Sequence, residues 1–233
     1  VDGALMHVDG VFDGTAVDPW RVSRYVGSPL DFRHGAWLGS VEVDDPAIRA
    51  VALSYSDSLL SALTNTPTVF HLEVFVRSDA AGGLSCVFVE VAARAGGAEI
   101  PFLWREVHGY DLMGEAFRLA LGDHRPALSA PQRPPAAPSD EYAGLLLVPS
   151  PAIRPCRITS VQPVLGTAAA PPELYAEEIS SIGDIIPAAP AYYEHVGGRF
   201  RFRGRSSQAV ENAIRAVAGR FSVAGRHIAG EAS

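Results

Sequence analysis

The sequence predicts an α+β fold in which an antiparallel β-sheet flanked by helices is followed by a small C-terminal α+β unit. Apolar and polar residues alternate with a period of two in residues 68–77 and 84–92, which is typical of half-buried strands. After Asp45, the apolar residues instead recur at the spacing of a helix. Prolines are then so dense in residues 126–139 that neither a helix nor a sheet interior is expected there. These observations predict a sheet-and-helix portion, a connector and a second unit.

The composition narrows the classes of partner. The chain has 233 residues, of which 48% are apolar, so it is long enough for one large domain or two small ones. Its net charge of −7 is spread along the chain, and the sequence holds no basic patch for a nucleic-acid backbone. No run approaches the roughly 18 to 20 apolar residues that span a bilayer. We therefore expect a cytoplasmic protein without a nucleic-acid or membrane partner, with Cys86 and Cys156 as reduced thiols.

The first residues are expected to form an antiparallel meander. Residues 4–8 and 20–26 have the pattern of strands, and turns are predicted around Gly10 and Gly14. A helix should follow, with Asp45 as its N-cap and Pro46 at its first position. Its buried stripe is expected to consist of Ile48, Val51, Ala52, Tyr55, Leu59 and Leu63.

Beyond the predicted hairpin of residues 68–92, a second helix should begin near Asp111 and end before Gly122. We expect the connector, residues 126–139, to separate a larger portion, residues 1–125, from a smaller unit, residues 140–233. The smaller unit is predicted to contain strands at 144–148, 157–161 and 199–203 and a helix at 207–220. The third of these strands, in which Arg and Phe alternate, is expected to be an edge strand with one solvated face.

The hairpin brings two carboxylates to one face. Side chains alternate along a strand, so Glu73 lies on the face opposite to the apolar residues of the first arm. If Val87, Val89 and Val91 form the apolar face of the second arm, Glu90 shares the face of Glu73. Matching these faces across the turn places Glu73 directly opposite Glu90 or one diagonal step away.

Two carboxylates at this separation repel each other unless a cation or a basic group compensates. Mg²⁺ is bound in proteins by one or two carboxylates together with phosphate and water oxygens, so the pair suits a metal–nucleotide site. Arg94 follows closely, and the flexible Gly96 and Gly97 allow a ligand to approach the backbone. The alternative is that the two carboxylates are solvated and that Arg94 is their ion-pair partner.

The histidines give weaker evidence for a functional site than the two carboxylates do. His71 shares the predicted face of Glu73, and it is either a structural residue or a part of the site. The other histidines have no common spacing, so the sequence does not argue for a zinc cluster; they are His7, His34, His108, His124, His195 and His227.

Several stretches resemble ATP-grasp enzymes. They are Thr68-Val-Phe-His-Leu-Glu-Val-Phe-Val, Phe88-Val-Glu-Val-Ala-Ala-Arg-Ala-Gly-Gly-Ala-Glu-Ile and Gly109-Tyr-Asp-Leu, with Val1-Asp-Gly, Asp13-Gly14, Val22-Ser-Arg-Tyr25, Gly183-Asp-Ile-Ile-Pro and Gly204-Arg-Ser-Ser. The chain is similar to the C-terminal catalytic portion of the carboxylate-amine ligases, including L-amino acid ligases. The fold that this implies is the C-terminal half of the ATP-grasp fold.

The resemblance implies roles for individual residues. Glu73 and Glu90 would bind Mg²⁺, or Mn²⁺ in its place, together with ATP, and Arg94 would contact the transferred phosphoryl group and the substrate carboxylate. Further binding roles fall to Arg24 for the nucleotide and to Gly96, Gly97 and His71 for the substrate. The implied reaction joins a small carboxylate to an amine, such as an amino acid, through an acyl phosphate.

The sequence departs from the family in two respects. Ala92 occupies a position at which many relatives carry Asn, and all 19 basic residues are Arg, so a phosphate-binding lysine is absent from this chain. We therefore expect a fragment whose N-terminal part, with the lysine and the adenine-binding region, is a further partner in the active enzyme. Two other interpretations stay open: a biotin-carboxylase-like enzyme, and a catalytically silent ATP-grasp-like interaction module.

Overall fold

A computed structural model describes residues 2–122, 141–188 and 196–228. The chain divides into two compact units. The first unit comprises residues 1–25, 41–142 and 205–207, and the second comprises residues 26–40, 143–204 and 208–233. The expected connector at 126–139 lies outside the described residues. No helix of the described chain is long and apolar enough to cross a membrane.

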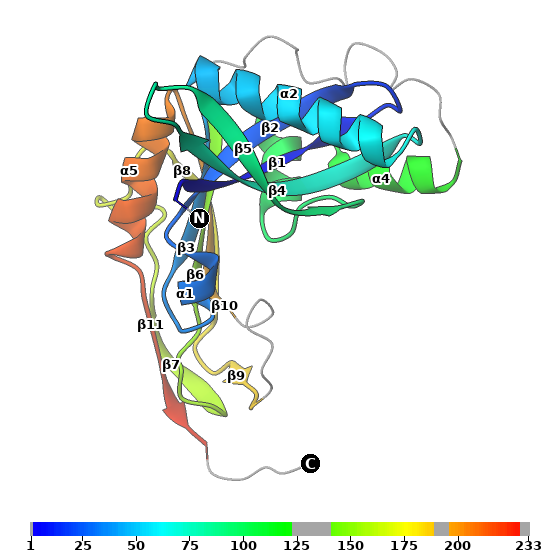
Figure 1. The fold of residues 1–233 in the computed structure, drawn as a ribbon. Coiled ribbons are helices and arrows are strands. Elements are labelled where there is room, and N and C mark those ends of the chain that lie inside the picture. The colour runs from blue at the N-terminus through cyan, green and yellow to red at the C-terminus, as the bar shows by residue number, and fades with distance from the viewer. Residues whose placement is uncertain (1, 123–140, 189–195, 229–233) are drawn as a thin grey trace. The chain divides into compact units, whose positions relative to one another are not determined.

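Antiparallel strands form the centre of the first unit, in the order β5-β4-β1-β2 (Figure 1). The strands are β1 (Ala4–Phe12), β2 (Val17–Val26), β4 (Thr68–Ser78) and β5 (Leu84–Ala92), and the helices are α2 (Pro46–Leu63), α3 (Ile100–Val107) and α4 (Leu112–Ala120). The predicted antiparallel sheet with flanking helices is thus confirmed. The turn expected at Gly10 is wrong, because β1 continues through it; a Cβ there would clash with the carbonyl oxygen of Pro19 on β2.

Helix α2 covers the apolar face of these strands (Figure 1). The Asp45 carboxylate accepts hydrogen bonds from the backbone of Ala47 and Ile48, so the predicted N-cap is confirmed. The buried line of the helix runs through Ala52, Ser56 and Leu60. Leu63, which was expected on that line, is 59% exposed, whereas Ile48, Val51, Tyr55 and Leu59 are partly buried against the core.

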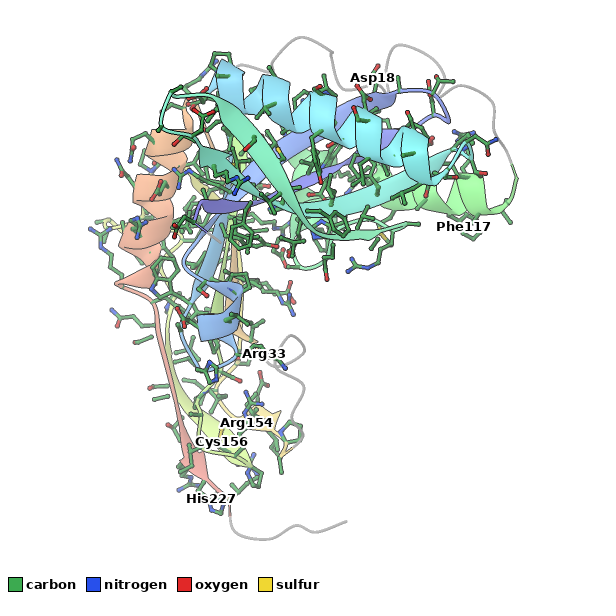
Figure 2. The ribbon with its side chains drawn as sticks, viewed as in Figure 1. Asp18, Arg33, Phe117, Arg154, Cys156 and His227 are labelled. Atoms are coloured by element: carbon green, nitrogen blue, oxygen red, sulfur yellow. The ribbon has the colours of Figure 1, made fainter. Side chains whose placement is uncertain are left out.

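The opposite face of the strands carries the polar residues described below and is flanked by α3 and α4. Helix α4 begins after Asp111, whose carboxylate accepts a hydrogen bond from the backbone of Gly114, as the sequence predicted. Helix α3 was not predicted, since its short run after a glycine loop has no capping side chain. Phe117 projects outward from α4 and is 68% exposed (Figure 2).

The second unit is a smaller α+β assembly in which residues 26–40 join residues 143–204 and 208–233, whereas the sequence predicted a unit of residues 140–233 alone. Its elements are α1 (Pro29–Phe32), β6 (Tyr142–Pro149), β7 (Cys156–Gln162), β8 (Leu174–Ile179), β9 (Ile185–Ile186), β10 (Val196–Gly204), α5 (Ser207–Ala218) and β11 (Ser222–His227), while β3 (Leu38–Glu42) contributes residues to both units. Strand β10 lies between β6 and β8, so the prediction of an edge strand at 199–203 is wrong. Its Phe200 and Phe202 are fully buried, as is typical of a strand that lies inside a sheet rather than at its edge.

A three-stranded sheet, in the order β11-β7-β9, completes the second unit. Cys156 on β7 is buried with Ile158 and Ile186, and it pairs with His227 of β11 (Figure 2). Cys156 and Cys86 are both free thiols, as expected.

Candidate active site

The site is built on three neighbouring strands. Strand β1 pairs with β2 on one side and with β4 on the other, and the register sets Asp9 opposite His71 and His7 opposite Glu73. Because side chains alternate along each strand, these four residues lie on the face turned away from α2. Three of them, His7, Asp9 and His71, are buried.

Glu73 and Glu90 are directly paired, which confirms the register expected for the hairpin. The predicted faces of the second arm are wrong beyond this point, because Glu73 pairs with Glu90 whereas Val74 pairs with Phe88, so that one residue is inserted in β5. The resulting β-bulge turns Cys86 toward the apolar core, and Phe88, which pairs with Val74 on the same face, is 47% exposed. It also ends the regular ladder beside the two carboxylates, where a strand commonly bends to direct a side chain.

The Glu73 carboxylate is held ionised. Its Oε1 accepts a 2.5 Å hydrogen bond from the hydroxyl of Tyr25 and lies 3.7 Å from Nε2 of His71. Burial raises the pKa of Glu73, but the interactions with His71 and Tyr25 outweigh burial, so the pKa falls below its ordinary value. Glu90, in contrast, is exposed. The pair therefore combines one fixed carboxylate with one that is open to solvent.

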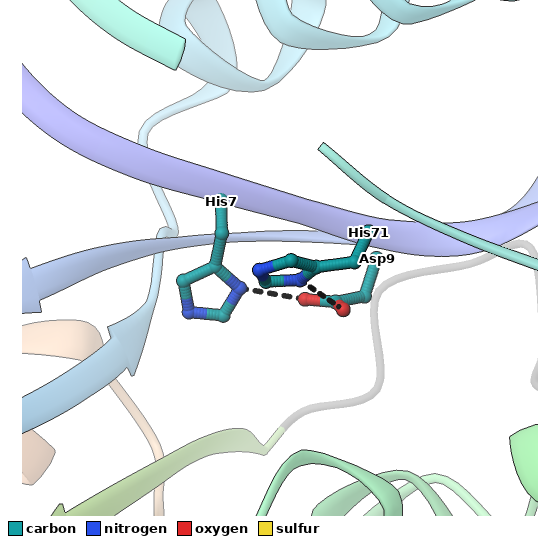
Figure 3. A group of neighbouring side chains, drawn as sticks. All are labelled: His7, Asp9 and His71. Atoms are coloured by element: carbon teal, nitrogen blue, oxygen red, sulfur yellow. Dashed lines mark hydrogen bonds and ion pairs between the residues drawn. The ribbon is translucent and has the colours of Figure 1, made fainter. Parts of the chain in front are cut away.

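Behind Glu73, the Asp9 carboxylate joins two imidazoles (Figure 3). Its Oδ2 lies 2.6 Å from Nδ1 of His7, and its Oδ1 lies 2.8 Å from Nδ1 of His71. Burial raises the pKa of Asp9, yet the two histidines lower it well below its usual range. Burial lowers the pKa of His71, but the charge of Asp9 dominates and raises it to about 10. His71 is thus a cation paired with Asp9 at neutral pH.

The loop after β5 packs on this cluster. Gly96 is buried, and a Cβ at this position would clash with Oδ1 of Asp9 and lie 3.0 Å from Nδ1 of His71. Gly97 instead faces open space. Arg94 donates a hydrogen bond from its guanidinium to the carbonyl oxygen of Ala95, 2.9 Å away. The structure therefore brings Gly96 against His71, whereas Arg94 folds onto its own loop.

Arg24 is not brought to the carboxylates. It pairs with Met6 of β1, which lies on the apolar face toward α2, so alternation places Arg24 on the other side of the sheet from Glu73. The next residue, Tyr25, reaches Glu73 instead. Tyr25 lies in one of the stretches that resemble ATP-grasp enzymes, but the sequence alone predicts no role for it.

His7 and Asp9 were also missed. Their only signal in the sequence is the spacing of two residues, which puts both side chains on one face of a strand. Their meeting with His71 depends on the pairing of β1 with β4, and these strands are separated in the sequence by β2, α1, β3 and α2. Hence two histidines without common spacing do come together in the fold, contrary to the impression that the sequence gives.

Two groups of side chains have the donors to hold a metal ion. Among the described residues, His7, Asp9 and His71 offer ligand atoms within 4.8 Å of one another. Both Nδ1 atoms already bond to Asp9, however, and all three residues are buried, which leaves little access for an ion. Glu73 and Glu90 fit a hard divalent cation better, because both offer oxygen, Glu73 is ionised and Glu90 is open to solvent.

Solved structures resemble the chain in fold. An L-amino acid ligase from Bacillus licheniformis matches with a TM-score of 0.68 and 16% identity, over 97% of this chain and 55% of that one. A phosphoribosylglycinamide synthetase from Anaerococcus prevotii matches with a TM-score of 0.60 and 12% identity, over 97% of this chain and 54% of the other. The biotin carboxylase domain of a single-chain bacterial carboxylase matches with a TM-score of 0.59 and 17% identity, over 97% and 49%.

The chain thus has the fold of the ATP-grasp enzymes, as its motifs predicted, and it spans about half the length of these structures. No family model matches the sequence, and neither does any curated protein.

Proposed function

We propose that the complete protein is a cytoplasmic, ATP-dependent ligase that joins a carboxylate to an amine. The observation that carries this proposal is the direct pairing of Glu73 with Glu90, on the polar face of a sheet with the ATP-grasp fold. An acidic pair inside a sheet is unfavourable by itself, so its presence calls for a cation. The fold then favours a metal–nucleotide as the source of that cation.

In this proposal, Glu73 and Glu90 hold Mg²⁺, or Mn²⁺, and ATP. When bound, Mg²⁺-ATP would supply its terminal phosphoryl group to the substrate carboxylate, giving ADP and an acyl phosphate. The amine would then attack the acyl carbon and displace inorganic phosphate, which leaves an amide bond. The chain itself contributes positioning: Tyr25 keeps Glu73 fixed, and the exposed Glu90 reaches toward solvent. No residue of the chain needs to form a covalent intermediate.

Arg94 and the glycines after it are assigned to the substrate. A guanidinium can pair with a phosphoryl or carboxylate group in two parallel hydrogen bonds, and Arg94 has only to exchange its bond to the Ala95 carbonyl for such a ligand. The open space beside Gly97 admits a ligand to the backbone. His71 borders this loop, whereas Arg24 would serve the nucleotide only from the other face of the sheet.

A biotin-carboxylase-like activity is the second candidate, because biotin carboxylases also match the fold with TM-scores up to 0.59. The two activities differ in what stimulates ADP release from the complete protein. A ligase responds to amino acids and small carboxylic acids, whereas a carboxylase responds to bicarbonate with biotin. The L-amino acid ligase gives the higher TM-score of 0.68, and we therefore place the ligase first.

The test is Glu90→Gln in the complete protein, with the exposed Glu106→Gln on α3 as the matched control. Removing one metal carboxylate should lower amine-dependent ADP release by about two orders of magnitude, since metal charge stabilisation contributes several kcal/mol to such reactions. The melting temperature should be almost unchanged, because Glu90 is exposed. Full activity of Glu90→Gln would contradict the proposal, and so would a wild-type protein that does not bind Mg²⁺-ATP, which would favour a silent module.

A further inference from the structure

The buried Asp9 carboxylate forms the centre of a chain of contacts that ends on Glu73. His7 and His71 occupy its two oxygens at 2.6 and 2.8 Å (Figure 3). Nε2 of His71 lies 3.7 Å from Oε1 of Glu73. We propose that Asp9 is a positioning residue, which fixes the ring of His71 and thereby the carboxylate of Glu73. The inference rests on the proposed role of the Glu73–Glu90 pair in binding a metal–nucleotide.

The ring of His71 has two orientations related by a half-turn about its bond to Cβ. One orientation directs Nδ1 to Asp9 and Nε2 to Glu73, and the other directs ring carbons to the same two places. The hydrogen bond to Oδ1 of Asp9 selects the first orientation, since a carbon cannot replace the donor. Asp9 thus decides which atom His71 presents to Glu73, and His71 is the side chain between Asp9 and Glu73 in this chain of contacts.

His7 closes the arrangement from the other side. Its Nδ1 bonds to the second oxygen of Asp9, and its ring packs against Tyr25 with 5.1 Å between the ring centroids. Tyr25 in turn donates a hydrogen bond from its hydroxyl group to Oε1 of Glu73. Two side chains, Tyr25 and His71, therefore approach the same carboxylate oxygen, and Asp9 and His7 support both of them.

This convergence sets the direction of the Glu73 carboxylate. With Tyr25 and His71 on Oε1, the other oxygen, Oε2, is the one that Glu73 can present to a cation; among the described residues no hydrogen bond to Oε2 is found. Outer residues that orient a metal-binding carboxylate commonly change metal affinity by about 10- to 100-fold when they are lost. Asp9, His7, His71 and Tyr25 together are named the carboxylate clamp.

The test compares two substitutions of His71, each of which places an amide group where one of the two ring nitrogens lies. In His71→Asn the short side-chain amide can replace Nδ1 and keep the bond to Asp9, but it does not reach Glu73. In His71→Gln the longer amide can replace Nε2 and donate to Glu73. The readout is the binding of Mn²⁺ to the complete protein with a non-hydrolysable ATP analogue, followed by electron paramagnetic resonance, together with the melting temperature.

We expect His71→Asn and Asp9→Asn to raise the half-saturating Mn²⁺ concentration by about tenfold or more, with His71→Gln restoring much of the affinity. If His71→Asn and His71→Gln bind Mn²⁺ equally well, the clamp is contradicted. A wild-type protein that binds no Mn²⁺ with the analogue contradicts the proposed function and the clamp together, whereas wild-type binding without any loss in the variants contradicts the clamp alone.

A second outcome would also overturn the inference. If the purified protein contains one zinc or iron ion per chain and Asp9→Asn loses it, His7, Asp9 and His71 are metal ligands rather than a hydrogen-bonded support. Elemental analysis of the wild-type protein and of Asp9→Asn decides this point. The clamp predicts no stoichiometric transition metal in either protein.

Discussion

Among the described residues, the first unit contains two buried carboxylate–histidine clusters, and one of them leads to the exposed Glu90. In the carboxylate clamp, Asp9 bonds to His71, and His71 contacts Glu73. Glu73 in turn is paired with the exposed Glu90 of β5. In the second cluster, Nε2 of His108 lies 2.6 Å from Oε1 of Glu42, and their side chains are 0% and 7% exposed.

The second cluster is closed by a cation. The Arg21 guanidinium is 4.0 Å from Glu42 and 5.8 Å from the ring centroid of Trp104. Burial lowers the pKa of Arg21, although the charge of Glu42 opposes this. The two clusters use similar side chains for different purposes. The Glu42 cluster connects β2 and β3 with α3, whereas the clamp fixes the Glu73 carboxylate beside the solvent-exposed Glu90.

The largest expected effect on stability comes from a substitution that disrupts the Glu42 cluster. His108→Ala removes one hydrogen-bond partner of the buried Glu42 carboxylate, which costs about 1 to 3 kcal/mol in the free energy of unfolding, and more when the group left behind is charged. Urea denaturation of the variant measures this cost. Activity per folded molecule should be retained in the complete protein, because the cluster is separate from Glu73 and Glu90. A stable variant with lost activity would reverse the roles that we assign to the two clusters.

The next effect concerns the glycine loop. Gly96→Ala places a methyl group against Asp9 and His71, and such overpacking costs about 1 to 3 kcal/mol. ADP release by the complete protein should fall with it, since the clamp is displaced. For the free energy of unfolding, Gly97→Ala is the matched control, because a Cβ there meets open space. Equal behaviour of the two variants would show that the loop does not support the clamp.

The pH dependence of stability reports on the clamp directly. The pKa of His71 is raised from 6.5 to about 10 in the folded chain, so its contribution to stability is complete below pH 6.5 and is lost as the pH rises toward 10. The pKa of Asp9 is lowered, so its contribution is lost as the pH falls below the ordinary range of a carboxyl. In His71→Asn, the loss between pH 6.5 and 10 should disappear. Chemical denaturation in metal-free buffer across this range measures it, and an unchanged slope would contradict the ion pair.

The smallest effect separates two tyrosines. Tyr25→Phe deletes the hydrogen bond to Glu73 and should lower the free energy of unfolding by about 0.5 to 1.5 kcal/mol. The hydroxyl of Tyr110 is buried without a hydrogen-bond partner in the part of the chain that the structure describes. Tyr110→Phe should therefore leave the melting temperature unchanged or raise it. The opposite order of the two melting temperatures would contradict this assignment.

Local features of the fold were predictable because they depend on neighbours in the sequence. Asp45 and Asp111 predicted the starts of their helices, because both are favourable N-cap residues. The pairing of Glu73 with Glu90 followed from the alternation of side chains along the strands and from the length of one turn. The bulge in β5 was not predictable, because parity assumes a regular ladder. The burial of Leu60 in place of Leu63 depended on how α2 meets the strands.

The rest of the site required long-range pairing. His7 and Asp9 meet His71 only because β1 inserts between β2 and β4, a choice that no local pattern specifies. The same pairing turned Arg24 away from the carboxylates and brought Tyr25 to them. The pairing of Glu73 with Glu90 was therefore predictable from the sequence, whereas the residues that hold Glu73 were not.

The central claim is that Glu73 and Glu90 bind a metal–nucleotide together. Calorimetric titration of the complete protein with ATP, with and without Mg²⁺, tests it most directly when Glu90→Gln and the control Glu106→Gln are measured in parallel. We predict Mg²⁺-dependent binding in the wild-type protein and in Glu106→Gln, and its loss in Glu90→Gln at an unchanged melting temperature. Binding of equal strength in all three proteins, or binding that does not depend on Mg²⁺, would contradict the account.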